Sequence, residues 1–154
     1  MVWPGDGPSG ATEPKPLSDF RDVPVYALLG EPGSGKTTEF EKERQELGNE
    51  VATVTARDFI TFDLANHPEW RDRTLYIDGL DEMRASAADA RSPLDEIRRR
   101  LDQLGRPNFR ISCREADWLG HSDRQALMAV APDRRMTVLL LHPPSPSRIQ
   151  ALPN

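Results

Sequence analysis

The chain has 154 residues, a formal net charge of −5 at pH 7 and a sequence pI near 5.2. This length suits one domain with a buried core, and the acidic balance excludes the broad basic field with which proteins attract nucleic acid or anionic lipid. Its apolar runs fall far short of the roughly 20 residues of a membrane span, and no secretion signal opens the chain. A single cysteine excludes an internal disulfide. We therefore expect a cytoplasmic protein.

The first 18 residues contain four prolines among glycine, serine and acidic residues. Such a composition buries too little apolar surface to order a chain, so we expect a disordered N-terminal segment, 1–18, with Trp3 exposed. Residues 17–23 should pack beside the first strand. That strand is Val25–Leu29, whose five consecutive apolar or aromatic residues are too few for a helix and predict burial on both faces of a sheet.

A glycine-rich loop follows this strand and fits the pattern G-x-x-x-x-G-K-S/T at every fixed position. Glycines let the backbone turn tightly and approach a ligand, and the loop N–H groups at the start of a helix can bind phosphate oxygens. Lys36 would neutralise the β- and γ-phosphates, and the Thr37 hydroxyl would bind Mg²⁺. A chance glycine-rich turn is the alternative. The expected nucleotide-binding residues are Gly30, Glu31, Pro32, Gly33, Ser34, Gly35, Lys36, Thr37 and Thr38.

Helical and strand patterns alternate along the rest of the chain. We expect helices over 35–47, 58–66, 92–104 and 118–128, the third capped by Ser92 and the fourth broken near Gly120. Strands are expected over 51–55, 75–78, 109–113 and 136–141. The triple arginine of residues 98–100 is interpreted as a charged outer face, with a basic docking site as the alternative. Alternating strands and helices predict an α/β fold with a parallel sheet.

The strand that ends at Asp78 carries a second acidic group just beyond it, Asp81 and Glu82. An apolar strand that ends in an acidic residue can hold a phosphate-bound Mg²⁺ opposite the loop, so Asp78 is the expected metal ligand beside Thr37. Asp81 and Glu82 are placed to orient or activate an attacking water. The alternative is that both acids merely cap or solvate a turn.

These two segments, Gly30–Thr37 and Asp78–Glu82, resemble the Walker A and Walker B motifs of NACHT-type STAND NTPases, which are relatives of the AAA+ ATPases. The run D-G-L-D-E of the second motif is present in full. Ser112-Cys113-Arg114 resembles the family's sensor 1, which implies that Arg114 contacts the γ-phosphate. A surface arginine at a strand end is the alternative. Cys113 is interpreted as a buried strand thiol, with a redox-sensitive one as the alternative.

The resemblance implies a three-layer P-loop NTPase fold with a five-stranded parallel sheet of order 5-1-4-3-2. It implies ATP and Mg²⁺ as ligands, because a guanine-specifying N-K-x-D motif is not seen. It divides the chain into an NTPase core, 19–142, and the start of a missing C-terminal helical region, 143–154. It also implies an ATP/ADP switch that forms a homo-oligomer or works with sensor and effector domains, in prokaryotic defence or signalling. Arg84 and Arg91 are candidates for an arginine finger.

Three functions remain open from the sequence. The first is slow ATP hydrolysis as a conformational switch, with Lys36, Asp81, Glu82 and Arg114 as catalytic residues. The second is a truncated domain that binds nucleotide or a partner without turnover. The third is a small-molecule kinase, for which Asp58 lies near the end of the second strand.

Overall fold

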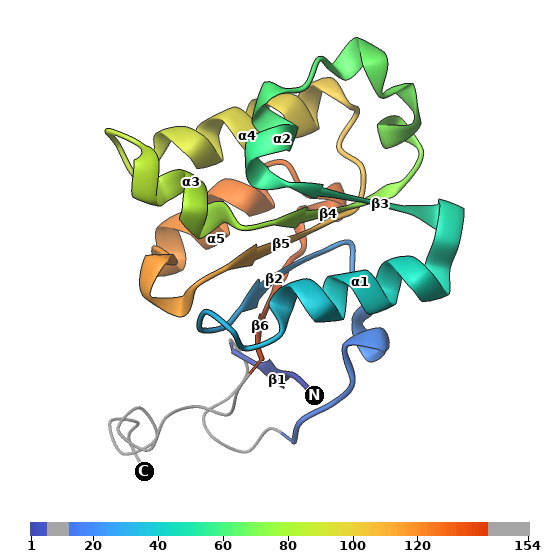
Figure 1. Cartoon of the computed structure of the whole chain (residues 1–154), viewed down its shortest axis with the longest axis vertical. Helices are drawn as coiled ribbons and strands as arrows, with labels where there is room; N and C mark the ends of the chain where they lie inside the picture. The colour runs from blue at the N-terminus through green and yellow to red at the C-terminus, as the bar shows by residue number, and fades with distance from the viewer. Residues whose placement is uncertain (6–12, 142–154) are drawn as a thin grey trace.

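The fold is taken from a computed structural model, which describes residues 1–5 and 13–141 (Figure 1). Its centre is a six-stranded mixed sheet in the order β1-β6-β2-β5-β4-β3. The strands are β1 (Trp3–Pro4), β2 (Val25–Leu29), β3 (Val51–Thr55), β4 (Thr74–Asp78), β5 (Phe109–Cys113) and β6 (Thr137–Leu140).

Five of these strands, β2 to β6, run parallel to one another. Counted along the chain, they lie in the predicted order 5-1-4-3-2. The prediction of five parallel strands was nevertheless incomplete, because β1 adds an antiparallel edge strand that pairs Trp3 with Leu140 and Pro4 with Leu139. A strand of two residues is too short to produce an alternating pattern in the sequence.

Helices cover both faces of the sheet, which gives three layers (Figure 1). One face carries α1 (Lys36–Leu47), and the other carries α2 (Ala56–Thr61), α3 (Leu80–Ser86), α4 (Ser92–Gln103) and α5 (Gly120–Met128). Short 3₁₀ turns complete the connections: η1 (Leu17–Phe20), η2 (Gly48–Glu50), η3 (Leu64–Asn66), η4 (Pro68–Arg71), η5 (Glu115–Asp117) and η6 (Pro132–Arg134).

The strand β2 is buried over its whole length, as its sequence predicts. Val25, Ala27 and Leu29 belong to the larger apolar cluster beneath α2, α4 and α5, whereas Tyr26 and Leu28 belong to the smaller cluster beneath α1. Because successive side chains of a strand point to opposite faces, an unbroken apolar run is what a strand covered on both sides needs.

Some described residues of the segment 1–18, which the sequence predicts to be disordered, make packing contacts. Val2 is fully buried, its N–H donates to the Lys15 carbonyl at 2.7 Å, and Leu17 joins the cluster beneath α1. Trp3 packs against the larger cluster and is only partly exposed. The average composition of the segment gives no sign of these contacts, because only a few apolar residues make them. Residues 6–12 and the predicted helical region 143–154 lie outside the described part of the chain.

Several helix boundaries differ from the prediction. The helix α2 begins at Ala56 because the Thr55 hydroxyl accepts the Asp58 N–H at 3.1 Å, and it ends at Thr61 rather than continuing to residue 66. Ser92 is the first residue of α4 and not its N-cap, while the predicted apolar stripe of α4 is buried. The last helix, α5, starts at Gly120. Within residues 1–5 and 13–141, no helix has the length and apolarity to cross a bilayer.

Candidate functional site

The glycine-rich loop connects β2 to α1 at the carboxyl edge of the parallel strands. Gly33 and Gly35 have φ angles of 78° and 100°, in the left-handed region that favours glycine. A Cβ at Gly30 would lie 2.6 Å from Ser34 Oγ and 3.3 Å from Leu141 Cβ, so this position has no room for a side chain. The Gly30 N–H donates to the Cys113 carbonyl at 3.2 Å, which fixes the loop to the end of β5.

Lys36 is the first residue of α1, and its side chain turns back over the loop. Its ammonium donates to the carbonyl oxygens of Gly30 and of Glu31, the latter at 3.3 Å. The positive end of the α1 dipole lies at the same place. The loop therefore combines one fixed cation with the N-terminal N–H groups of a twelve-residue helix, an arrangement that attracts an anion.

Thr37 and Asp78, the two predicted metal ligands, are in direct contact. The Thr37 hydroxyl donates to Asp78 Oδ2 at 2.7 Å. On the other side of the carboxylate, the Ser112 hydroxyl donates to Asp78 Oδ1 and accepts the Gly79 N–H at 2.9 Å. Hydroxyl and carboxylate oxygens are the ligands that Mg²⁺ prefers in proteins, so Thr37 and Asp78 fit that metal.

Ser112 was not recognised as a site residue from the sequence, apart from its place in the sensor-like run. It is completely buried on β5, beside the end of β4. A serine between the apolar Ile111 and Cys113 is the signal that could have indicated it, because a buried hydroxyl needs a partner. Its contact with Asp78 holds the carboxylate in a fixed direction.

Asp81 and Glu82 lie in the first turn of α3, which begins immediately after Gly79. Asp81 Oδ1 accepts the Arg114 N–H at 3.2 Å, so this carboxylate connects α3 to the end of β5. Glu82 is exposed, and its carboxyl carbon would lie 3.6 Å from a Cβ placed on Gly79. The two acids therefore have different surroundings, which the sequence did not distinguish.

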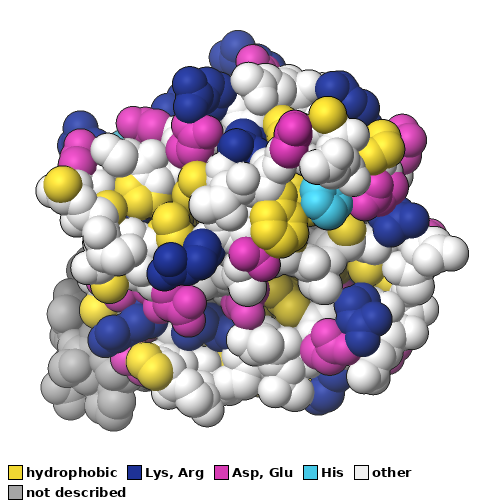
Figure 2. Space-filling view, turned by 45° about the horizontal axis from the view of Figure 1, so that its top comes forward, with side chains coloured by type: hydrophobic (Ala, Val, Ile, Leu, Met, Phe, Trp, Pro, Cys, Tyr) yellow, Lys and Arg dark blue, Asp and Glu magenta, His cyan; other side chains and the backbone are white. Residues whose placement is uncertain are grey.

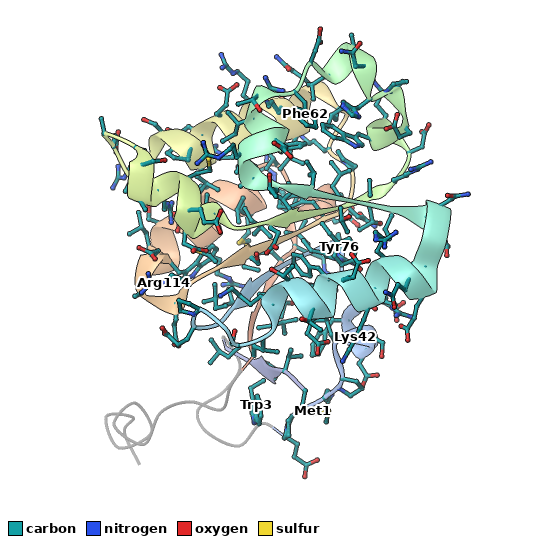
Figure 3. The ribbon with its side chains drawn as sticks, viewed as in Figure 1. Met1, Trp3, Lys42, Phe62, Tyr76 and Arg114 are labelled. Carbon is teal, nitrogen blue, oxygen red and sulfur yellow. The ribbon has the colours of Figure 1, made fainter. Side chains whose placement is uncertain are left out.

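Arg114 follows β5 and lies on the side of the molecule where the loop before α1 is found (Figure 3). Its Nε is 3.5 Å from Asp117 Oδ2, and 43% of its side chain is exposed. The structure brings the predicted site residues, apart from Gly30, into the lining of one open cavity of about 410 Å³. Its lining includes residues 31–38, Thr55, Asp78, Gly79, Asp81, Glu82 and Arg114.

The two candidates for an arginine finger differ in position, and the burial of Arg84 argues against that role. Arg84 is buried and forms an ion pair with Asp123, so its guanidinium cannot reach a neighbouring molecule. Arg91 is exposed just before α4, and its backbone N–H donates to Asp89 Oδ1 at 2.9 Å. It does not line this chain's cavity, as a finger supplied to a neighbouring molecule need not, so Arg91 stays a prediction.

A second, larger groove of about 660 Å³ adjoins the first along β3 and shares Thr37, Thr55 and Asp78 with it. One of its walls is a stack of rings, in which His67 lies 4.2 Å from Trp70 and 5.3 Å from Phe62 between centroids. Figure 2 shows side chains of both charge signs mixed with hydrophobic ones on the face that it presents.

The remaining expectations concern Arg98–Arg100 and Cys113. The arginines pair with acids of their own helix, Arg98 with Asp95 and the other two with Glu96, as a charged outer face should. Cys113 is completely buried, and burial raises the pKa of its thiol to about 12. Such a thiol is protonated at neutral pH, which favours the structural interpretation over a redox-sensitive one.

No protein-family model matches the chain, and no curated protein matches it. Among solved structures, that of C. elegans PCH-2 is similar, with 17% identity and a TM-score of 0.49. The match covers 83% of this chain and 38% of the PCH-2 chain. A likeness this distant does not show the NACHT type, so what the site binds must be inferred from its own residues.

Proposed function

We propose that this chain is a P-loop NTPase domain that binds ATP with Mg²⁺ and hydrolyses it slowly. The observation that carries the proposal is the 2.7 Å contact between Thr37 of the loop and Asp78 of β4, inside the cavity that Lys36 also lines. Two residues that are 41 positions apart in the chain are thus in contact, which supports a site for a magnesium triphosphate.

The loop residues would bind the triphosphate. The backbone N–H groups of Gly33–Thr37 surround the phosphate oxygens, and the Lys36 ammonium exchanges its carbonyl partners for the β- and γ-phosphates. Thr37 and Asp78 would hold Mg²⁺, which would neutralise charge on the phosphates. Ser112 keeps the Asp78 carboxylate directed toward the loop.

Glu82 is the residue that we assign to the attacking water. It is exposed and lines the cavity, whereas Asp81 uses an oxygen to accept the Arg114 N–H. A carboxylate that orients water supplies a modest but real acceleration, since phosphoryl transfer depends mainly on positioning and charge neutralisation. Asp81 therefore acts by placing Arg114.

Arg114 would contact the γ-phosphate and so distinguish ATP from ADP. Among the described residues that line the cavity, Lys36 and Arg114 are the cations. No further cation among the described lining residues could act as an arginine finger. We therefore expect slow turnover, because such a finger accelerates phosphoryl transfer by several orders of magnitude. Slow turnover suits a switch, and the NACHT resemblance suggests that the domain works in the cytoplasm with sensor or effector domains or as a homo-oligomer.

A phosphate-release assay tests this function. Malachite green should detect phosphate from ATP and Mg²⁺ with the wild-type chain and not with Lys36→Ala. Equal release from both proteins would refute the proposed site. If ATP is retained on the wild-type protein without ADP formation over hours, the domain binds nucleotide without turnover.

A small-molecule kinase is the second candidate, and the groove along β3 favours it. Asp58 lines this groove together with Thr37 and Asp78. An acceptor hydroxyl there would bond to the γ-phosphorus as the bond to the ADP oxygen breaks, with its proton passing to Asp58. Transfer of label from [γ-³²P]ATP to a small hydroxyl compound, rather than to water, would establish this reaction instead of hydrolysis.

A further inference from the structure

Arg84 occupies an unusual position for a charged side chain, because it is buried on α3, the helix that carries Asp81 and Glu82 of the cavity. Its Nε donates to the Ala90 carbonyl at 2.8 Å, and Nη1 donates to the Asp117 carbonyl at 2.7 Å. Nη1 and Nη2 also form a two-pronged pair with Asp123, at 2.5 and 2.7 Å. Asp123 in turn accepts the Leu119 N–H at 2.7 Å. Every contact of this guanidinium is with a segment outside α3.

These contacts close a ring that includes the proposed γ-phosphate contact. Asp81 of α3 accepts the Arg114 N–H, Arg114 pairs with the Asp117 carboxylate, and the Asp117 carbonyl accepts from Arg84. Arg84 is three residues after Asp81 on the same short helix, so it lies on the adjoining turn. The backbone and the side chain of Arg114 are therefore both held by residues that Arg84 fixes.

The helix α3 needs such an anchor because it has only seven residues. Isolated helices of that length are not stable in water, so their direction depends on tertiary contacts. The buried residues of α3 are Leu80, at its first position, and Arg84. Leu80 holds the start of the helix in the core, and Arg84 fixes its rotation and its distance from the η5 turn.

We propose that Arg84 is a positioning residue of the nucleotide site. Through Asp117 and α3 it sets the direction of Arg114 and the place of Glu82 relative to the phosphates. This inference rests on the proposed function, because it assigns Arg84 a role in the same cavity. Lysine could not replace it, since one ammonium cannot serve two separate carbonyls and both Asp123 oxygens in the geometry of a guanidinium.

Simple removal of Arg84 would leave the Asp123 carboxylate buried and unpaired, which is strongly destabilising. Two other variants avoid this problem. Asp117→Ala removes the half-exposed carboxylate that pairs with Arg114 and leaves the carbonyl that Arg84 binds. Arg84→Met/Asp123→Leu leaves no unpaired buried charge, although the Ala90 and Asp117 carbonyls and the Leu119 N–H lose their partners, so its stability is measured alongside its activity. Arg99→Ala, on the exposed face of α4, is the matched control.

The measurements are the affinities of the full chain for Mg²⁺-ADP and Mg²⁺-ATPγS, and kcat for phosphate release, with folding checked by urea unfolding. For both variants we expect an unchanged ADP affinity, loss of the preference for ATPγS over ADP, and a kcat lower by about 10- to 100-fold. Arg99→Ala should behave as wild type. A merely structural role would lower stability without separating ADP from ATPγS.

The outcomes distinguish this inference from the function on which it rests. An active wild-type protein, with variants that retain its kcat and its ATPγS preference, would refute the role of Arg84 alone. A wild-type protein that matches Lys36→Ala in both binding and phosphate release would refute the proposed function, and this inference with it.

Discussion

Replacement of Thr37 by valine should separate the stability of the fold from the affinity for Mg²⁺-nucleotide. Valine keeps the branched shape of threonine and removes the hydroxyl that donates to Asp78 at 2.7 Å. That hydrogen bond is exposed, so its loss should lower the free energy of unfolding by about 1 kcal/mol or less, a fall in Tm of about 2–4 °C. Removal of a metal ligand should lower the affinity for Mg²⁺-ATPγS at least about tenfold.

Titration calorimetry with ATPγS, with Mg²⁺ and with EDTA, is the appropriate assay. Thr37→Val should bind like the wild type in EDTA and more weakly in Mg²⁺, and Thr37→Ser should regain the Mg²⁺ dependence. Thr61→Val is the matched control, because Thr61 is an exposed helical threonine with one side-chain hydrogen bond, to the Arg57 carbonyl at 3.0 Å. If Thr37→Val shows the same Mg²⁺ dependence as Thr61→Val, the hydroxyl does not bind the metal.

Three further predictions concern the acids, the thiol and a buried cation. Glu82→Gln should lower the rate of phosphate release about 100-fold with unchanged ATPγS affinity. Asp81→Asn should lower this rate less than about tenfold, because the amide oxygen can still accept the same backbone hydrogen bond. The opposite order of the two rates would assign the attacking water to Asp81. Because burial raises the pKa of the Cys113 thiol to about 12, the unfolded chain loses this proton first as the pH rises, so stability falls. From about pH 8.5 to 10.5 the free energy of unfolding should decrease by about 2 kcal/mol more in the wild type than in Cys113→Ala, as measured by urea unfolding, and equal decreases would contradict the burial effect. Arg110→Met should cost about 2–4 kcal/mol in the same assay, because three backbone carbonyls of residues 21–24 lose their buried donor, and a change below about 1 kcal/mol would show that water replaces it.

The sequence predicted those elements whose signal is local. Val51–Thr55 and Phe109–Cys113 were predicted with the bounds that the structure has, because each is a compact run of strand-forming residues. The glycine-rich loop was recognisable in the sequence because its conformation requires glycine at fixed positions. Gly33 and Gly35 have positive φ angles, and Gly30 has no space for a side chain. The position of the site at the carboxyl edge of the sheet could be predicted because parallel strands end at the same edge, which places Thr37 and Asp78 together.

What the sequence could not supply depends on contacts between distant segments. The helix α3 was missed because its seven residues carry no apolar stripe, and its anchor is an arginine whose partner, Asp123, is 39 residues away. From the sequence, Arg84 was therefore only a candidate arginine finger. Trp3 was assigned to a disordered segment because its pairing is with Leu140 of β6, at the other end of the described chain.

The most direct test of the nucleotide site is a crystal structure of the chain with Mg²⁺ and ATPγS. We predict phosphate oxygens within hydrogen-bonding distance of the N–H groups of Gly33–Thr37, with Mg²⁺ between the Thr37 hydroxyl and the Asp78 carboxylate and with the Arg114 guanidinium at the terminal phosphate. A nucleotide bound elsewhere, or a triphosphate on the loop whose metal contacts neither Thr37 nor Asp78, would contradict the proposed function.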